Sequence, residues 1–405
     1  MQQQSWLLPD GIVELTGYSA QKLERIRRTL LDLYQSWGYS LIFPPLVEFL
    51  DSLIAGAGDE LELQTFKVTD QISGRMLGVR ADITPQVARH DAYHNTGEVN
   101  RLCYAGSVLH TKPTHILANR SLIQAGAELY GHHGVASDLE ILELLLSSLA
   151  LCDDENSTDA DWTLTVGHAS LTRALLEKLQ LPAAGQDTIL RALKNRSEPD
   201  LVQAAGLYSL STQQVDGLIQ LVNLCGSIDI LKEAAKLEPS HEKELESLQN
   251  IYNTCSQQYQ HINWFFDFSS INNYSYESGI TFHATHAKSA EPLARGGRYD
   301  YLSQVYGANR PAVGFSCDLL ALARKTSEGL PQVERRVWAP SFAEFTDITA
   351  QNALRQKVQS LRAENKAVTT SVHQKSWQQL DSSIQEKYDG YLEHDGKEWV
   401  LKSAK

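Results

Sequence analysis

The sequence predicts an α+β protein whose core is a mostly antiparallel sheet. Strand-like stretches are separated by long excursions, and a block of helical periodicity at about 170–260 interrupts them. After Pro331 the pattern changes to a short α/β tail. A length of 405 residues indicates two or three domains. We therefore divide the chain into a core at 1–325, which contains the helical insertion, and a small C-terminal α/β domain at 331–405.

The first 95 residues predict two helices and three strands. Ser19 can cap a helix whose apolar residues recur at steps of three and four until Gly38. The run Tyr39–Pro45 is strand-like and ends in two prolines, which cannot donate to a ladder. Residues 65–79 form two strand-like runs around a polar turn. Thr84-Pro85 is typical of an N-cap followed by proline at the first helical position.

The remaining elements follow from similar patterns. Ser137 and Glu140 form a capping box before an apolar helix, and the acidic stretch 152–161 predicts a surface loop. Strand-like stretches lie at 101–109, 121–130, 162–166, 264–268, 279–283 and 312–316. The tail predicts a strand at 337–339, a helix at 350–362, a strand at 367–372 and a hairpin at 388–401 that turns at Asp395-Gly396.

The charge balance is acidic. The chain has 36 Lys and Arg against 49 Asp and Glu, a formal charge of −13. This balance argues against a protein that holds nucleic acid through its overall charge, because neutralising phosphates requires a concentration of basic side chains. A local basic groove stays possible.

Several features favour a cytoplasmic protein without a metal or cofactor of its own. Five widely spaced cysteines are typical of reduced thiols: Cys103, Cys152, Cys225, Cys255 and Cys317. The N-terminus lacks the basic and apolar regions of a signal peptide, and no apolar run reaches the ~18 residues of a membrane span. His90 and His94 lie four apart on a predicted helix, but no zincin glutamate follows His90 and no third ligand is evident.

The first group of candidate binding residues is Asp82 and Thr84. They lie where a strand ends and a helix begins. A carboxylate and a hydroxyl at this position suit an α-ammonium group. Simple capping of the helix would explain the same two residues equally well.

The second group is Gln124 and Glu128. They are four residues apart on a strand and so point to the same face. Gly126 lies between them without a side chain, which leaves room for a small ligand. A buried polar pair on an apolar strand is costly without a partner, and this favours a ligand over a core position.

The third group follows two glycines in the sequence Gly296-Gly297-Arg298-Tyr299. Paired glycines allow the backbone to turn tightly. We expect such a turn to present Arg298 and Tyr299 outward.

Read in order, these segments resemble the catalytic core of histidyl-tRNA synthetase, a class II aminoacyl-tRNA synthetase. The resemblance covers residues 8–150 and 262–325, and it implies an antiparallel sheet flanked by helices. The approach from Gly38 to Pro45 resembles motif 1, and the stretch 57–131 resembles the ATP and amino-acid loops around motif 2. Residues 296–315 resemble the segment leading into motif 3.

The chain departs from this family at the groups that stabilise adenylation. His110 occupies the position where motif 2 of the synthetases carries an arginine, and Lys112 lies two residues further on. Asn272 occupies the position where the histidine motif carries a second arginine. Leu320 and Ala321 replace the Glu-Arg pair of motif 3. Losing one preorganised stabiliser of transition-state charge typically costs about 2.7–4 kcal/mol. We therefore expect no aminoacylation.

The resemblance implies that the amino-acid pocket is largely kept. In the synthetases the matching groups hold the α-ammonium and the imidazole of histidine. The positions concerned are Asp82, Thr84, Gln124, Glu128, Tyr276, Arg298 and Tyr299.

Such a combination resembles the regulatory subunits of ATP phosphoribosyltransferase, which are paralogues of the synthetase. It implies a non-catalytic chain that forms a homodimer within a hetero-octamer with the short-form catalytic subunit, and that takes L-histidine as effector. Neither nucleic acid nor a membrane is an expected partner. Two alternatives stay open: a divergent histidyl-tRNA synthetase or other class II enzyme, and a tRNA-binding regulatory module.

Overall fold

The computed structural model describes residues 7–56, 58–94, 97–113, 118–152, 161–269, 277–289, 291–325, 336–341, 347–364, 366–371 and 376–404. The chain divides into two compact units, residues 1–327 and 328–405. Each unit contains its own sheet.

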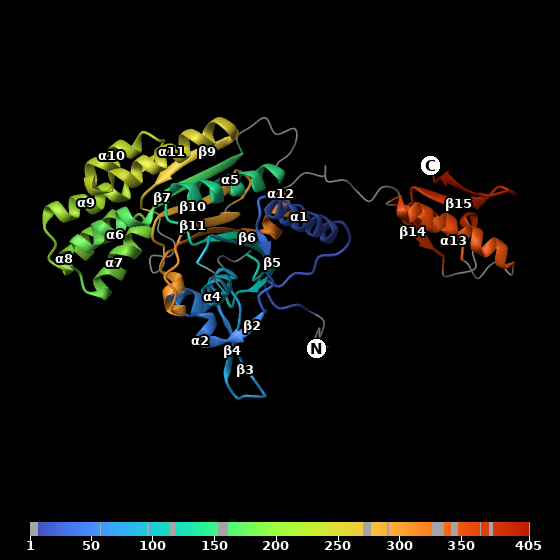
Figure 1. Ribbon diagram of the computed structural model, residues 1–405, viewed down its shortest axis with the longest axis horizontal. Coiled ribbons are helices and arrows are strands. Elements are labelled where there is room, and N and C mark those ends of the chain that lie inside the picture. Colours follow the sequence, from blue (N-terminus) through green and yellow to red (C-terminus); the bar gives the residue numbers. More distant parts are fainter. Residues whose placement is uncertain are drawn as a thin grey trace. The chain divides into compact units, whose positions relative to one another are not determined.

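The first unit is built on a nine-stranded sheet in the order β1-β5-β6-β12-β11-β10-β7-β9-β8 (Figure 1). All neighbouring strands are antiparallel except the pairs β1–β5 and β7–β9. The predicted, mostly antiparallel sheet is therefore confirmed. The strands are β1 (Ser40–Leu41), β5 (Asn100–Leu109), β6 (Ser121–Tyr130), β7 (Trp162–His168), β8 (Cys225–Gly226), β9 (Ile262–Asp267), β10 (Ile280–His286), β11 (Ala294–Arg298) and β12 (Ala312–Asp318).

The prediction of a tight turn at Gly296-Gly297 is wrong. Both glycines lie inside strand β11, and the side chains of Arg298 and Tyr299 are buried. A Cβ atom on Gly296 would lie 2.5 Å from the ring of Phe282, and one on Gly297 would lie 2.7 Å from a carbonyl oxygen of β10. The glycines therefore serve close packing within the sheet, and sequence alone did not distinguish this role from a turn.

Helices cover both faces of this sheet (Figure 1). On one face, α1 (Gly17–Ser36) packs against α5 (Val135–Leu151) and α12 (Leu319–Lys325). On the other face, α4 (Thr84–His94) packs against the short helix η2 (Leu302–Tyr306). A buried cluster beside α4 includes Ile83, Val87, Tyr104, Tyr130 and Tyr299. This cluster supports the candidate site.

The predicted capping box at Ser137 is also wrong. Helix α5 begins at Val135, two residues earlier, with Gly134 as its N-cap. The hydroxyl of Ser137 donates to the carbonyl of Gly134 at 2.9 Å. The carboxylate of Glu140 forms a salt bridge with Arg101. Ser137 therefore lies in the first turn of the helix, where its hydroxyl also accepts from Arg298, and Glu140 pairs with Arg101 instead of the backbone at the helix terminus.

A small three-stranded sheet in the order β2-β4-β3 adjoins this core. A Cβ atom on Gly78 of β4 would meet Leu53 at 2.8 Å, which shows how closely α2 packs on one face. The elements are β2 (Val47–Phe49), α2 (Leu50–Leu53), α3 (Gly58–Gln64), β3 (Phe66–Thr69) and β4 (Met76–Val79).

The stretch between β7 and β9 is mainly helical, as its periodicity predicts. Apart from β8, it consists of α6 (Ala169–Lys178), α7 (Ala183–Lys194), α8 (Glu198–Leu207), α9 (Thr212–Val222), α10 (Ile230–Leu237), the short helix η1 (Pro239–His241) and α11 (Glu242–Gln258). These helices lie together at one end of the nine-stranded sheet (Figure 1).

The second unit has a four-stranded sheet in the order β14-β13-β15-β16. Helix α13 packs on it over a core that includes Val337, Leu354, Val358 and Trp399. Its elements are β13 (Arg336–Ala339), α13 (Ile348–Ala363), β14 (Ala367–Thr370), the short helix η4 (Trp377–Gln379), α14 (Ser382–Gln385), β15 (Gly390–His394) and β16 (Trp399–Ser403).

Candidate functional site

The candidate site is built around the carboxylate of Glu128 in β6, whose side chain is 1% exposed. Its Oε1 accepts hydrogen bonds from the hydroxyls of Thr84 and Tyr104, each at 3.1 Å. Its Oε2 accepts a hydrogen bond from the hydroxyl of Tyr299. The structure therefore brings three predicted site residues together, because α4, β6 and the end of β11 meet at this point.

The protonation of Glu128 is strongly perturbed. Burial raises the pKa of its carboxyl group to about 8, and the hydrogen bond from Tyr299 opposes this shift. The nearby carboxylate of Asp82 raises the pKa further. A buried carboxyl group poised near neutral pH, with hydroxyls on both oxygens, is suited to exchange its partners with an imidazole N–H.

Asp82 and Gln124 hold the backbone that leads into α4. Oδ1 of Asp82 accepts from the amide of Thr84 at 3.2 Å, and Oε1 of Gln124 accepts from the amide of Ile83 at 3.1 Å. Asp82 therefore supports the start of the helix, whereas the hydroxyl of Thr84 is directed to Glu128. Each carboxylate or amide oxygen has a second lone pair, which can accept from a ligand ammonium.

The space over Gly126 is occupied by the chain itself. A Cβ atom on Gly126 would lie 2.6 Å from the hydroxyl of Tyr104. The expected room for a ligand directly over this glycine is therefore filled by a tyrosine ring. Sequence reasoning missed Tyr104, although its register opposite Gly126 on β5 places the two residues on one face.

Arg298 lies on the opposite face of the sheet from Glu128. It pairs across strands with Val313, which in turn pairs with Leu129, the neighbour of Glu128. Its guanidinium forms a salt bridge of 2.7 Å with Asp138 of α5 and donates to Ser137 Oγ at 2.7 Å. The structure thus separates Arg298 from the other predicted site residues.

Two further positions, Asn272 and Tyr276, lie outside the described residues. The neighbouring Ser278 donates from its amide to the carbonyl of Arg298, and its hydroxyl accepts from the amide of Asp300.

Among the replaced synthetase positions, His110 contacts the carbonyl of Ala81 through Nε2 at 2.9 Å. Leu320 is buried, and Lys112 is exposed. Arg80 and Arg120 donate to backbone carbonyls, among them those of Ser107 and His110. Neither their placement nor that of Lys112 recreates a phosphate clamp in the described part of the chain.

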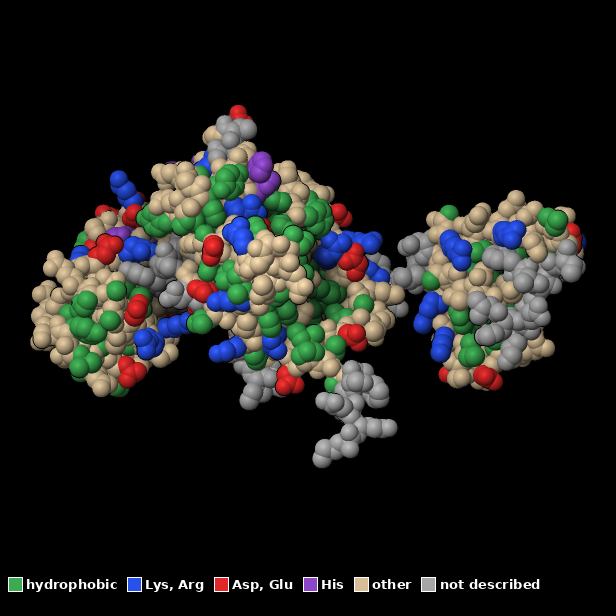
Figure 2. Space-filling model, turned by 90° about the horizontal axis from the view of Figure 1, so that it is seen from below, with side chains coloured by type: hydrophobic (Ala, Val, Ile, Leu, Met, Phe, Trp, Pro, Cys, Tyr) green, Lys and Arg blue, Asp and Glu red, His purple; other side chains and the backbone are tan. Residues whose placement is uncertain are grey.

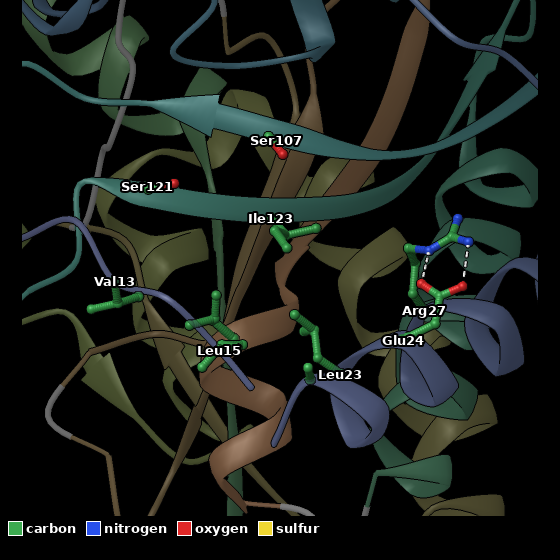
Figure 3. Close-up of a pocket in the computed structure, with 10 residues that line it drawn as sticks. Val13, Leu15, Leu23, Glu24, Arg27, Ser107, Ser121 and Ile123 are labelled. Atoms are coloured by element: carbon green, nitrogen blue, oxygen red, sulfur yellow. Dashed lines mark hydrogen bonds and ion pairs between the residues drawn. The ribbon is translucent and has the colours of Figure 1, made fainter. Parts of the chain in front are cut away.

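A cavity of about 320 Å³ lies on the other side of strands β5 and β6 (Figure 3). It lies on that side because Ile123 and Ser107 alternate with Gln124 and Gly106 along the strands. Its lining residues are Val13, Leu15, Ala20, Leu23, Glu24, Arg27, Ser107, Ser121, Ile123 and Leu320. The Glu24–Arg27 ion pair lies at one side of it (Figure 3). Leu320 lines this cavity.

The surface carries mixed charge. Lys and Arg side chains lie among acidic and apolar side chains on the face drawn in Figure 2. Within the described ranges, no three His, Cys, Asp or Glu side chains gather to hold a metal ion. Of the helices described, none is both long and apolar enough to cross a membrane.

The nine-stranded sheet, its flanking helices and the polar cluster at the start of α4 define a class II aminoacyl-tRNA synthetase-like protein. The family model of histidyl-tRNA synthetase matches residues 11–322. A solved structure from Bacillus halodurans, described as an ATP phosphoribosyltransferase regulatory subunit/histidyl-tRNA synthetase, superposes with a TM-score of 0.77 and 21% identity over 95% of this chain and 96% of that one. The structure of histidyl-tRNA synthetase from Nostoc sp. PCC 7120 superposes with a TM-score of 0.75 and 16% identity, over 99% of this chain and 98% of that one. These likenesses confirm the predicted fold.

Relatives with higher sequence identity show to which family within this class the chain belongs. The ATP phosphoribosyltransferase regulatory subunit of Marinomonas sp. is 41% identical over 89% of this chain and 90% of its own length. The protein of that description from Ralstonia nicotianae is 37% identical over 99% of both chains. The chain belongs to the family of ATP phosphoribosyltransferase regulatory subunits, as its resemblance predicts.

Proposed function

We propose that this chain is the non-catalytic regulatory subunit that the short-form ATP phosphoribosyltransferase catalytic subunit requires for activity. In this role it also conveys feedback inhibition by histidine at the first step of histidine biosynthesis. The observation that carries the proposal is an asymmetry within one fold. Asp82, Gln124 and Glu128 surround the start of α4, while His110 and Leu320 occupy positions where the synthetases carry charged groups.

The contacts of the site support histidine as the effector. Glu128 accepts three hydroxyl hydrogen bonds, and an imidazole N–H can replace one of them. Asp82 and Gln124 have free lone pairs for an α-ammonium group. Thr84 and Tyr299 fix the orientation of the Glu128 carboxylate, and Tyr276 is proposed to contact the same ligand. We leave Arg298 out of this pocket because it pairs with Asp138 on the other face.

Regulation requires two states of the complex with different affinities for histidine. A coupling free energy of ~1–3 kcal/mol between the histidine site and the catalytic subunit is enough for feedback. The assembly proposed is a homodimer of this chain within a cytoplasmic hetero-octamer. ATP and phosphoribosyl pyrophosphate bind the catalytic subunit, and this chain carries no cofactor.

The test combines calorimetry with an activity assay. Histidine is titrated into the purified chain and into its complex with a short-form catalytic subunit, and the activity of the complex is measured with and without histidine. We expect activation on assembly and loss of activity with histidine. Absence of histidine heat from both samples would rule out the sensor role.

Aminoacylation is expected to be absent. Each missing stabiliser of the adenylation transition state accounts for about 2.7–4 kcal/mol, a factor of 100 or more in rate. ATP–pyrophosphate exchange dependent on histidine measures this step directly. Exchange above the background of a protein-free sample would favour a divergent synthetase.

A further inference from the structure

The segment 80–86 carries two of the candidate site residues, Asp82 and Thr84, and its two ends meet through their side chains. Arg80 directly follows strand β4, and Gln86 lies in the first turn of α4. Nη1 of Arg80 donates to Oε1 of Gln86 at 3.5 Å. Arg80 is 6% exposed and Gln86 is 1% exposed. A buried polar contact therefore closes the segment at its base, with both candidate binding residues between the closing side chains.

The same two side chains fasten the segment to the chain that leads into β2. Nη1 of Arg80 also donates to the carbonyl of Pro44 at 2.8 Å. Nε2 of Gln86 donates to the carbonyl of Pro45 at 2.7 Å and to Oε1 of Glu48 at 2.9 Å. The amide nitrogen has two hydrogens, so these two bonds use both of them. Residues 44–48 thus hold both ends of the segment that passes through the site.

Two further contacts join the segment to the strands of the site. Nε of Arg80 donates to the carbonyl of Ser107 in β5 at 2.8 Å. A Cβ atom on Gly106 would lie 2.3 Å from Nη2 of Arg80, so this glycine leaves the space that the guanidinium occupies. Gly106 pairs across strands with Gln124, whose Oε1 accepts from the amide of Ile83 inside the segment. The segment is therefore held against β5 and β6 as well as against β2.

The polar character of this network indicates what it provides. A buried guanidinium and a buried amide are costly unless their hydrogen bonds are made, and a satisfied polar network fixes one arrangement more strictly than apolar packing does. Glu48 adds a second hold on α4, because its carboxylate is 9% exposed and also forms a salt bridge of 2.6 Å with Arg89. Contacts at Gln86 and Arg89 together fix the first turns of the helix.

We propose that Arg80, Gln86 and Glu48 are positioning residues, which hold the segment 80–86 in the conformation that presents its two candidate binding residues to the ligand. The link to histidine rests on the proposed function, whereas the closure of the segment concerns only the contacts of these three side chains. They act through the backbone between them and not by touching the ligand. Loss of one contact lets the segment move and lowers the affinity for histidine.

The experiment measures hydrogen–deuterium exchange of peptides covering 80–88 without histidine and, separately, histidine affinity by calorimetry on the chain and its complex. Gln86→Leu keeps a side chain of similar size and removes its three contacts. Glu48→Ala removes the acceptor, whereas Glu48→Gln keeps an oxygen that accepts from Gln86. Asp91→Asn is the control on the same helix, because Asp91 is fully buried and accepts from Arg310 at 2.7 Å, beyond the segment.

We expect faster exchange at 80–88 in Gln86→Leu and Glu48→Ala, relative to peptides of α5 that report global unfolding. Histidine affinity should fall about 3- to 10-fold in both variants, the effect of one lost hydrogen bond. Glu48→Gln should restore both quantities to near the wild-type values. Asp91→Asn should lower stability to urea and leave exchange at 80–88, relative to α5, and histidine affinity unchanged.

Three results would contradict the inference. Unchanged relative exchange at 80–88 in Gln86→Leu and Glu48→Ala would show that these contacts do not hold the segment. An equal loss of affinity in Asp91→Asn would show that the network only stabilises the fold. Faster exchange with unchanged affinity would overturn the positioning role and leave the proposed function intact. If the wild type binds no histidine, the proposed function fails, and the exchange rates still decide whether the three side chains hold the segment.

Discussion

A Cβ atom on Gly314 would lie 1.5 Å from Oε2 of Glu128. The two residues pair directly across β12 and β6, so the glycine defines the position of the carboxylate. Gly314→Ala should displace Glu128 from its three hydroxyl partners, abolish histidine binding and destabilise the fold by about 1–3 kcal/mol. Calorimetry and urea denaturation check both effects.

Gly206 in α8 offers the control for this substitution. A Cβ atom there meets nothing within 4 Å, so Gly206→Ala should leave histidine affinity unchanged and slightly stabilise the helix. Histidine binding by Gly314→Ala at wild-type affinity would show that Glu128 does not contact the ligand.

The raised pKa of Glu128 predicts a pH-dependent stability. Its carboxyl group has a pKa of about 8 in the folded protein and an ordinary value near 4.5 when unfolded. Between these values the folded state binds more protons than the unfolded state, so stability falls as pH rises. The whole shift corresponds to roughly 5 kcal/mol, an upper bound since ionisation lets the site relax. Urea denaturation at pH 5, 7 and 8.5 measures the decline, and Glu128→Gln should flatten it.

The same pKa predicts proton release on histidine binding. The α-ammonium of histidine brings positive charge near Glu128 and favours its ionised form, so binding at pH 7 should release a proton and strengthen as pH rises from 6.5 to 8. The measured heat should then vary with the ionisation enthalpy of the buffer. A wild-type binding heat that does not vary with the buffer would contradict this prediction. In Glu128→Gln, which has no proton to release at this position, the binding heat should not vary with the buffer.

Arg298 should act on stability rather than on ligand binding. Arg298→Met leaves the buried Asp138 carboxylate without its partner. We expect this change to lower the free energy of unfolding by about 3–5 kcal/mol. Histidine affinity of the folded protein should stay within about twofold of wild type, since Arg298 lies on the other face of the sheet. A large loss of histidine affinity without a loss of stability would show that Arg298 contributes to the histidine pocket.

The charge distribution predicts no stable tRNA complex. Residues 328–405 contain eleven basic and eleven acidic residues, so the net charge of −13 resides in the first unit. Because phosphate neutralisation dominates nucleic-acid affinity, a gel-shift assay near physiological salt should show free tRNA. A discrete shifted band with this chain would support the alternative of a tRNA-binding module.

Local sequence patterns predicted most of the fold. The strand expected at 121–130 is β6, with the same bounds. The helix expected between a cap at Ser19 and a stop at Gly38 is α1, but its N-cap is Thr16, so Ser19 lies inside the helix. Strand β11 was missed, because its glycines act through distant contacts with Phe282 and β10 that no local pattern reveals. The capping box at Ser137 failed for a similar reason, since Arg298 uses that hydroxyl.

The site was predictable where strand periodicity governs it. The four-residue spacing of Gln124 and Glu128 placed both on the face that meets α4. The alternation of β11 and its register with β12 decide that Arg298 and Tyr299 point to opposite faces, which required knowing that a strand exists there. Tyr104 could have been found from its register opposite Gly126.

The three hydroxyls around Glu128 compete with any incoming donor for the same oxygens. Binding of a ligand donor to Glu128 therefore exchanges one hydrogen bond for another of nearly equal strength and does not satisfy an unpaired acceptor. Such an exchange yields a shallow energetic gain and fast release. A metabolite sensor built this way responds over the concentration range of its metabolite instead of saturating at traces of it.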